Sequence, residues 1–269
     1  MKFCRFQPLE FSAAVTRAGQ TLSPSPRIGR IEGEWVHEVS GSLLGETRPA
    51  GKSWKLAEVA FLPPAVPSKI VCVGHNYHAH IAEFQHDIPS EPLIFLKPPS
   101  SIIAPGEAIV LPEASKRVDY EGELCIVMRR ACTQLSDTDD VRPYVLGYTC
   151  LNDVTARDLQ EKDSQWTRAK GFDTFCPFGP VLETELDLKS ATVETYVNGR
   201  KKQSAPISLM IFSVDVIIRW ISRIMTLEPG DIIATGTPAG VGPLAAGDLV
   251  EVAVSGIGTL RNPVQGRIA

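Results

Sequence analysis

Residues 118–128 read VDYEGELCIVM, an apolar run interrupted by two glutamates. Its β-branched and aromatic residues predict a strand. Strand side chains alternate between faces, so Glu121 and Glu123 are expected side by side on one face. Carboxylates this close repel each other unless one is protonated or a positive charge lies between them. A divalent cation with oxygen ligands would satisfy this condition. Two solvated acids on an edge strand are the alternative.

Composition excludes several classes of protein. The chain has 269 residues, of which 43% are hydrophobic and 22% charged, which is typical of a folded globular protein. Its net charge is −4 without a basic stripe, so we expect no nucleic-acid partner. No apolar run reaches the ~18 residues that a membrane span requires. The six cysteines are scattered, without a C-x-x-C pair, which predicts reduced thiols and a cytoplasmic location.

Two units are predicted along the chain. Residues 1–60 alternate apolar and polar residues around glycines and are expected to form a small β-rich N-terminal domain. A proline-rich segment at 61–67 is expected to separate this domain from a catalytic domain over 68–269. Many short strand patterns and few helical ones, without regular alternation, predict an α+β fold that is predominantly β, built as a sandwich or roll.

A metal site would need a third acid, and Asp153 is the candidate. It ends the apolar run 144–151 and precedes a short polar segment, where it could instead cap a helix. Together with Glu121 and Glu123 it would carry three negative charges. Carboxylates without imidazole or thiolate favour Mg²⁺ or Mn²⁺ over Zn²⁺.

Four of the five histidines fall within residues 75–86. A zinc site is one interpretation, although their spacing does not match that of a metalloprotease helix. The other interpretation pairs His80 with Glu83, which share a face at i, i+3 of a helix. The carboxylate would orient the imidazole as a general base. A local ion pair on a surface helix remains the alternative.

A glycine-rich segment at 230–242 lacks the pattern of a phosphate loop. Within it, the N–H groups around Gly236 and the Thr237 hydroxyl could hold a carboxylate; a tight turn is the alternative. Lys97 and Lys170 lie at or after apolar segments and could polarise a carbonyl group or hold an anion, or simply lie on the surface.

Five motifs, taken in order, resemble the fumarylacetoacetate hydrolase superfamily. They span residues 68–269 and are GHNY at 74–77 with His80 and Glu83, FLKPPS at 95–100, DYEGEL at 119–124, NDVTARDLQ at 152–160, and EPGD at 228–231 through TGTP at 235–238. The first 60 residues match no motif that we can name.

This resemblance implies a mixed β-sandwich roll and a homodimer. It implies Mg²⁺ or Mn²⁺ held by Glu121, Glu123 and Asp153. It places His80 and Glu83 as a catalytic dyad on a lid-like segment and implies a catalytic role for Lys170 as well. The remaining residues that it implies for the substrate are Lys97, Arg157, Gln160, Gly236 and Thr237. Two departures are His75, where arginine is common, and a short stretch between residues 160 and 170.

The expected reaction is metal-dependent hydrolysis of a C–C bond in a small acylpyruvate-like acid, through an enolate, with the dyad activating water. Isomerisation of the 2-hydroxyhepta-2,4-diene-1,7-dioate type, or decarboxylation of oxaloacetate, is the close alternative. The family's setting implies aromatic catabolism. A catalytically idle metal-binding protein is a further alternative, although no member of the acid or dyad set is missing.

Overall fold

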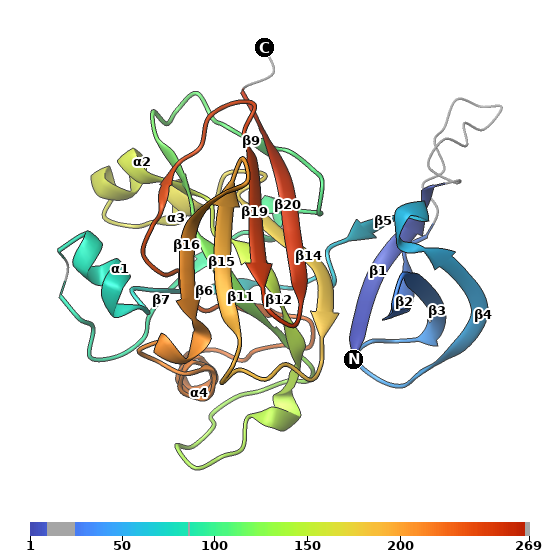
Figure 1. Ribbon diagram of the computed structural model, residues 1–269. Helices are drawn as coiled ribbons and strands as arrows, with labels where there is room; N and C mark the ends of the chain where they lie inside the picture. Colours follow the sequence, from blue (N-terminus) through green and yellow to red (C-terminus); the bar gives the residue numbers. More distant parts are fainter. Residues whose placement is uncertain (10–24, 86, 267–269) are drawn as a thin grey trace.

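The structure is a computed structural model that describes residues 1–9, 25–85 and 87–266 (Figure 1). Its strands are β1 (Lys2–Pro8), β2 (Arg27–Glu32), β3 (Trp35–Gly41), β4 (Thr47–Lys55), β5 (Val59–Leu62), β6 (Ile70–Gly74), β7 (Leu93–Lys97), β8 (Ile102–Ile103), β9 (Ile109–Val110), β10 (Val118–Tyr120), β11 (Gly122–Met128), β12 (Val145–Asn152), β13 (Thr155–Ala156), β14 (Cys176–Glu183), β15 (Thr192–Val197), β16 (Arg200–Pro206), β17 (Ile232–Ala234), β18 (Gly242–Pro243), β19 (Leu249–Val254) and β20 (Gly258–Gln265). Its α-helices are α1 (His78–Glu83), α2 (Arg157–Lys162), α3 (Thr167–Lys170) and α4 (Val214–Ile224).

Two sheets pack face to face. The larger has the order β4-β3-β2-β1-β14-β12-β11-β17-β6-β7, and the second has the order β16-β15-β19-β20-β9. Strands β15, β19 and β20 lie over β11, β12 and β14 (Figure 1). The core between the sheets contains Leu124, Ile126, Val193, Val252 and Leu260, all buried. Because β6 and β17 run parallel while their neighbours are antiparallel, the large sheet is mixed. The predicted mixed, mostly β sandwich is therefore confirmed.

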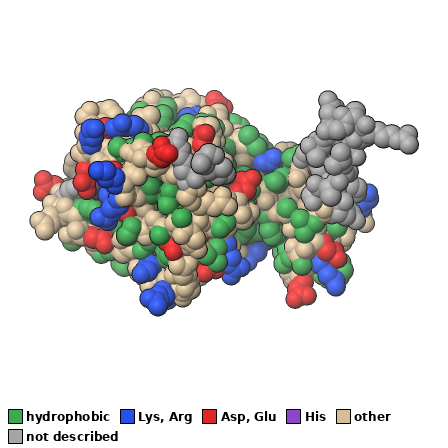
Figure 2. Space-filling model, turned by 90° about the horizontal axis from the view of Figure 1, so that it is seen from above, with side chains coloured by type: hydrophobic (Ala, Val, Ile, Leu, Met, Phe, Trp, Pro, Cys, Tyr) green, Lys and Arg blue, Asp and Glu red, His purple; other side chains and the backbone are tan. Residues whose placement is uncertain are grey.

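The N-terminal strands β1–β4 stand beside the main body (Figure 1). They continue the large sheet, because β1 pairs with β14 at Lys2↔Glu183 and Phe3↔Leu182. Strand β5 folds back onto β1 and ends at Leu62. The division into domains near residue 60 stays a prediction. Figure 2 shows both parts from above, with positive and negative side chains interspersed on this face.

The segment around the two glutamates is not the single strand that the sequence predicts. It breaks at Glu121, so that β10 belongs to a small third sheet with β13 and β18 while β11 enters the large sheet. The Glu121 N–H donates to the Asn152 side chain (2.9 Å) and the Gly122 N–H to the Gln203 side chain (3.0 Å). These side chains take the place of a neighbouring strand, which lets the chain change sheets there.

All six cysteines are buried and free, as predicted. In the described ranges, no helix is long and apolar enough to cross a membrane.

The buried carboxylate of Asp231 joins the starts of β6 and β17. It accepts hydrogen bonds from the Ser68 N–H (2.9 Å), the Ser68 hydroxyl (2.7 Å) and the Glu228 N–H (2.7 Å), and it pairs with the Lys69 ammonium. Burial alone would raise the pKa of Asp231, but Lys69 and these N–H groups lower it below its ordinary value. Asp231 thereby fixes the start of β6, the strand that leads into α1 and the candidate site.

We expect Asp231→Asn to lower the free energy of unfolding by about 2–4 kcal/mol, because a buried ion pair loses one partner. The folded-state pKa is depressed, so the contribution is present above the unfolded pKa of about 3.9 and is lost as pH falls through the folded value. The difference between wild type and variant should therefore narrow below about pH 4 in denaturant unfolding. Asp137→Asn, at a side chain 89% exposed, is the control and should change stability by less than about 1 kcal/mol. Equal effects of both variants would contradict this role.

Candidate functional site

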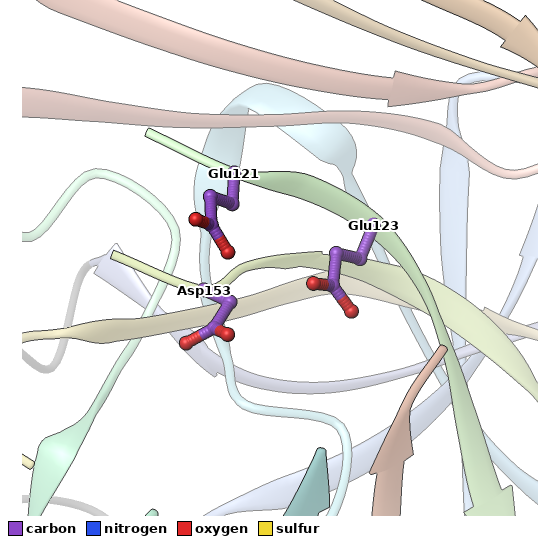
Figure 3. Close-up of side chains that lie close together, drawn as sticks. All are labelled: Glu121, Glu123 and Asp153. Atoms are coloured by element: carbon purple, nitrogen blue, oxygen red, sulfur yellow. The ribbon is translucent and has the colours of Figure 1, made fainter. Parts of the chain in front are cut away.

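Three carboxylates converge from two adjacent strand ends (Figure 3). Glu121 and Glu123 flank Gly122 at the start of β11, and Asp153 follows the end of β12. The register Gly122↔Asn152 brings these ends together. One oxygen from each carboxylate lies within 4.8 Å of the others, and all three residues are buried. The predicted trio is thus brought together by the fold.

Gly122 is required by close packing. A Cβ atom at this position would lie 2.0 Å from the Thr195 hydroxyl oxygen, and a Val252 methyl carbon would lie 3.2 Å away. A side chain here would therefore push β11 away from the second sheet and move both glutamates. Asp153 does not cap a helix, because α2 begins only at Arg157.

Three cations surround the carboxylates. The Lys170 ammonium donates to Glu121 (2.8 Å) and to Asp153 (2.6 Å), and the Lys97 ammonium donates to Asp153 (2.7 Å). Arg157 pairs with Glu121 and is itself held by Asp119, at 2.9 Å. Both lysines are almost completely buried, so neither is a surface residue.

The positive charge is unevenly shared among the acids. Burial raises the pKa of Glu121, but Lys170 and Arg157 outweigh burial and hold that pKa below its usual value. Burial, together with the charges of Asp153 and Glu121, holds the pKa of Glu123 well above its usual value. The Gly236 N–H donates to Glu123 at 2.7 Å. An unrelieved repulsion therefore remains on the Glu123 side of the trio.

The donor set fits a hard divalent cation. It consists of carboxylate oxygens close enough to share one ion, and their mutual repulsion is what such an ion would relieve. Oxygen ligands without sulfur or imidazole match Mg²⁺ or Mn²⁺ better than Zn²⁺.

His80 and Glu83 lie on α1 at hydrogen-bond distance. The His80 Nδ1 is 3.3 Å from a Glu83 carboxylate oxygen, and His80 is 6% exposed. Burial lowers the pKa of His80, while Glu121 and Glu83 partly oppose this shift, and the net lowering favours the neutral imidazole. The Gly240 N–H donates to Glu83 at 3.2 Å, which fixes the carboxylate from the opposite side.

A pocket of about 400 Å³ joins His80 to the acid trio, and Glu83 lies outside its lining. Its lining includes His80, the three acids and four further predicted residues, namely Arg157, Gln160, Lys170 and Thr237. Lys97 and Gly236 lie behind the acids, where the Lys97 ammonium and the Gly236 N–H bond to Asp153 and Glu123. The Thr237 hydroxyl donates to the Gly122 carbonyl at 3.0 Å and accepts from Gln203 at 2.8 Å.

The histidine-rich segment does not gather into a metal site in the part of the chain that the structure describes. His78 is exposed, and His86 lies outside the described residues. Among the described residues, the acid trio is the one group of three or more potential ligands whose atoms come together.

Several pocket residues are not among the predicted site residues. Val73, Phe84, Glu161 and Trp166 lie outside the five motifs, whereas Gly74 and Phe95 lie within two of them but have no predicted role. Trp166 gives the clearest signal, since a large aromatic side chain in the polar segment 161–168 has no helical stripe to join. Asp119, which belongs to the DYEGEL motif, accepts a hydrogen bond from Arg157 and thereby orients its guanidinium group.

Comparison with known proteins decides the family. The model of the fumarylacetoacetate (FAA) hydrolase C-terminal family matches residues 69–265. The chain belongs to this family. It is therefore an enzyme of the fumarylacetoacetate hydrolase superfamily, and the resemblance carried by the five motifs is confirmed. A second family model, Rv2993c-like, N-terminal, matches residues 1–64.

Similar proteins carry isomerase and tautomerase names. The chain is 48% identical to protein Rv2993c of Mycobacterium tuberculosis, over 92% of this chain and 97% of that one. It is 42% identical to the oxaloacetate tautomerase YisK of Bacillus subtilis, over 78% and 75%. The crystal structure of 2-hydroxyhepta-2,4-diene-1,7-dioate isomerase from Mycobacterium marinum has a TM-score of 0.86 and 43% identity, covering both chains completely. The predicted homodimer stays a prediction.

We expect Glu123→Gln to weaken Mn²⁺ binding about 100-fold or more, since loss of a second-shell group already costs 10–100-fold. The amide keeps the shape of the side chain and removes its charge. Isothermal titration calorimetry with Mn²⁺ measures the effect.

Glu161→Gln is the matched control, because Glu161 lines the same pocket but lies outside the acid trio. It should leave the Mn²⁺ affinity within about 3-fold of wild type, as expected for an exposed charge. Unchanged binding by Glu123→Gln, or equal losses in both variants, would refute the metal assignment.

Proposed function

We propose that this enzyme moves a proton at C3 of a small 2-oxo acid, interconverting its keto and enol forms with the help of Mg²⁺ or Mn²⁺. The observation that carries the proposal is the shared pocket, in which a buried imidazole and three converging carboxylates face the same space. The oxaloacetate tautomerases among its relatives support this reaction class, so oxaloacetate is the first substrate to test.

Glu121, Glu123 and Asp153 would hold the cation. When bound, it supplies a Lewis acid that favours negative charge on the carbonyl oxygen of a 2-oxo acid. Glu121, Glu123 and Asp153 carry −3 when all three are ionised, and the bonded cations Lys97, Lys170 and Arg157 carry +3, of which Arg157 also pairs with Asp119. A divalent ion would make this cluster more positive, which favours the binding of an anionic 2-oxo acid.

His80 would act as the base. Its neutral ring accepts a proton from C3, the C–H electron pair moves into the C2–C3 bond, and the carbonyl π pair moves onto oxygen. The imidazolium then gives the proton to that oxygen, which completes the enol; ketonisation runs the same steps backwards. Glu83 would hold the ring in place and stabilise its transient charge. Arg157, Lys170, Gln160 and Thr237 would orient the carboxylate end of the substrate.

Replacing His80 by Asn should lower kcat for oxaloacetate tautomerisation by about 10²–10⁴-fold, the usual contribution of a positioned base. Mn²⁺ affinity should stay within about 3-fold, because His80 is outside the acid trio. Decay of enol absorbance in the presence of Mg²⁺ measures the rate. His78→Asn, an exposed histidine on the same helix, is the control and should keep the wild-type rate. Full activity in the His80→Asn variant would show that His80 is not the base.

Hydrolysis of an acylpyruvate is the second candidate. The hydrogen-bonded His80–Glu83 pair favours it, because the same base could deprotonate a water that attacks the distal carbonyl group. Decarboxylation of oxaloacetate is a related reaction, because loss of CO₂ also leaves an enolate whose negative charge the same site would stabilise.

Product analysis separates these reactions. With acetylpyruvate, hydrolysis releases pyruvate and acetate in equal amounts, whereas tautomerisation releases neither. With oxaloacetate, pyruvate appears only on decarboxylation. We expect enol decay well above the spontaneous rate, with no more pyruvate from either compound than in the control without enzyme. Stoichiometric pyruvate from acetylpyruvate would replace the tautomerase proposal by the hydrolase.

A further inference from the structure

Asp119 is a buried carboxylate beside the candidate site. In the described part of the chain it belongs neither to the acid trio nor to the lining of the pocket. One of its oxygens accepts from Arg117 Nε at 3.0 Å, and the other accepts from Arg117 Nη2 at 3.1 Å and from Arg157 Nε at 2.9 Å. The Asp119 and Arg157 side chains are 0% and 6% exposed. Asp119 therefore gives Arg157 a buried carboxylate partner outside the trio.

The small third sheet fixes this pair. Strand β10 pairs with β13 so that Asp119 lies opposite Thr155. The N–H of Arg157, which directly follows β13, donates to the Arg117 carbonyl at 2.8 Å. The first residue of α2 is thus held beside β10 by the backbone. These contacts involve no side chain of the acid trio, so they keep Arg157 within reach of Asp119 whatever the trio binds.

Arg157 serves two groups that would compete for it. Its Nη2 bonds to Glu121, a candidate metal ligand, while its guanidinium group lines the pocket. Its Nη1 bonds to Gln160, and the group lies over the Phe84 ring at 5.1 Å. Gln160 and Phe84 are uncharged, so its charge is balanced by Asp119 and Glu121. A cation at the trio would attract Glu121 and weaken one of these two ion pairs.

Asp119 is the partner that a bound cation would leave in place. A buried charge that loses its partner is strongly unfavourable. Without the Asp119 carboxylate, Arg157 would therefore stay on Glu121 and oppose the binding of the cation. With it, Arg157 keeps one buried ion pair while Glu121 turns to the metal. Arg117, whose side chain is 49% exposed, supports Asp119 from the solvent side.

We propose that Asp119 is a positioning residue that acts through Arg157. It holds the guanidinium group by its Nε edge, which releases Glu121 for the divalent cation. The edge formed by Nη1 and Nη2 then remains at the pocket for the carboxylate of the substrate. This inference rests on the proposed function, because it assumes a metal at the acid trio and a substrate carboxylate at Arg157. It adds to that function a residue that lies outside the pocket.

Binding of Mn²⁺ to the full chain, measured by titration calorimetry, tests the proposal. Asp119→Asn keeps the shape of the side chain and removes its charge. It should weaken Mn²⁺ binding about 10–100-fold, the usual cost of losing a group that orients a metal ligand. Asp158→Asn is the matched control, because Asp158 ties α2 to Ser115, at 2.6 Å, and to the Lys116 N–H, at 3.0 Å. It should leave the affinity within about 3-fold of wild type.

A double-mutant cycle shows whether Arg157 carries the effect. In the Arg157→Gln background, Asp119→Asn should change Mn²⁺ affinity by less than about 3-fold, because no guanidinium group remains to compete for Glu121. An equally large loss in both backgrounds would overturn the inference, since it would point to the charge of Asp119 alone or to damaged structure. Unchanged affinity in the single Asp119→Asn variant would overturn it as well.

A crystal structure of the Mn²⁺-loaded wild type tests the proposal without any variant. Arg157 Nε should stay within about 3.2 Å of Asp119 while the distance from Nη2 to Glu121 increases. Loss of the bond to Asp119 would overturn the inference. Failure of the proposed function has a different signature. In that case Mn²⁺ would bind with the affinities predicted for wild type and variants, while wild type would not accelerate the enol decay of oxaloacetate.

Discussion

The burial of three like charges in one small space is the constraint on which the site depends. Glu121, Glu123 and Asp153 approach within 4.8 Å in the interior, where repulsion is poorly screened. Two buried lysines and Arg157 offset part of it, but Glu123 keeps a raised pKa. Because the pKa of Glu123 stays raised, a further positive charge at the trio would stabilise the ionised form of this residue. Under the proposed function, the same charge would stabilise the enolate of a 2-oxo acid.

The β-sandwich creates this arrangement because it brings segments that are distant in the sequence together at one junction between strands. The break between β10 and β11 presents two acids, and the end of β12 presents the third. Helix α1 carries His80 to the same pocket, and α3 contributes Lys170.

Local patterns predict what local interactions determine. The short helix that carries His80 and Glu83 follows from neighbouring residues. The strand break at Glu121 does not, because it depends on Asn152 and Gln203, which only the fold brings near. Nor could the sequence show that the Gly236 N–H is committed to Glu123 rather than to a substrate. The sequence also could not decide whether the long, flexible side chains of Lys97 and Lys170 lie on the surface or in the site. Their location depends on carboxylate partners that only the fold brings near.

The central claim is that the acid trio is a divalent metal site. The most direct measurement is anomalous X-ray scattering from a crystal of the protein equilibrated with Mn²⁺. A single strong peak within coordination distance of all three carboxylates, about 2.0–2.4 Å from their oxygens, is the predicted result. The account would be contradicted by a peak at the histidines of residues 75–80, or by ordered carboxylates that bond only to Lys97, Lys170 and Arg157 with no metal between them.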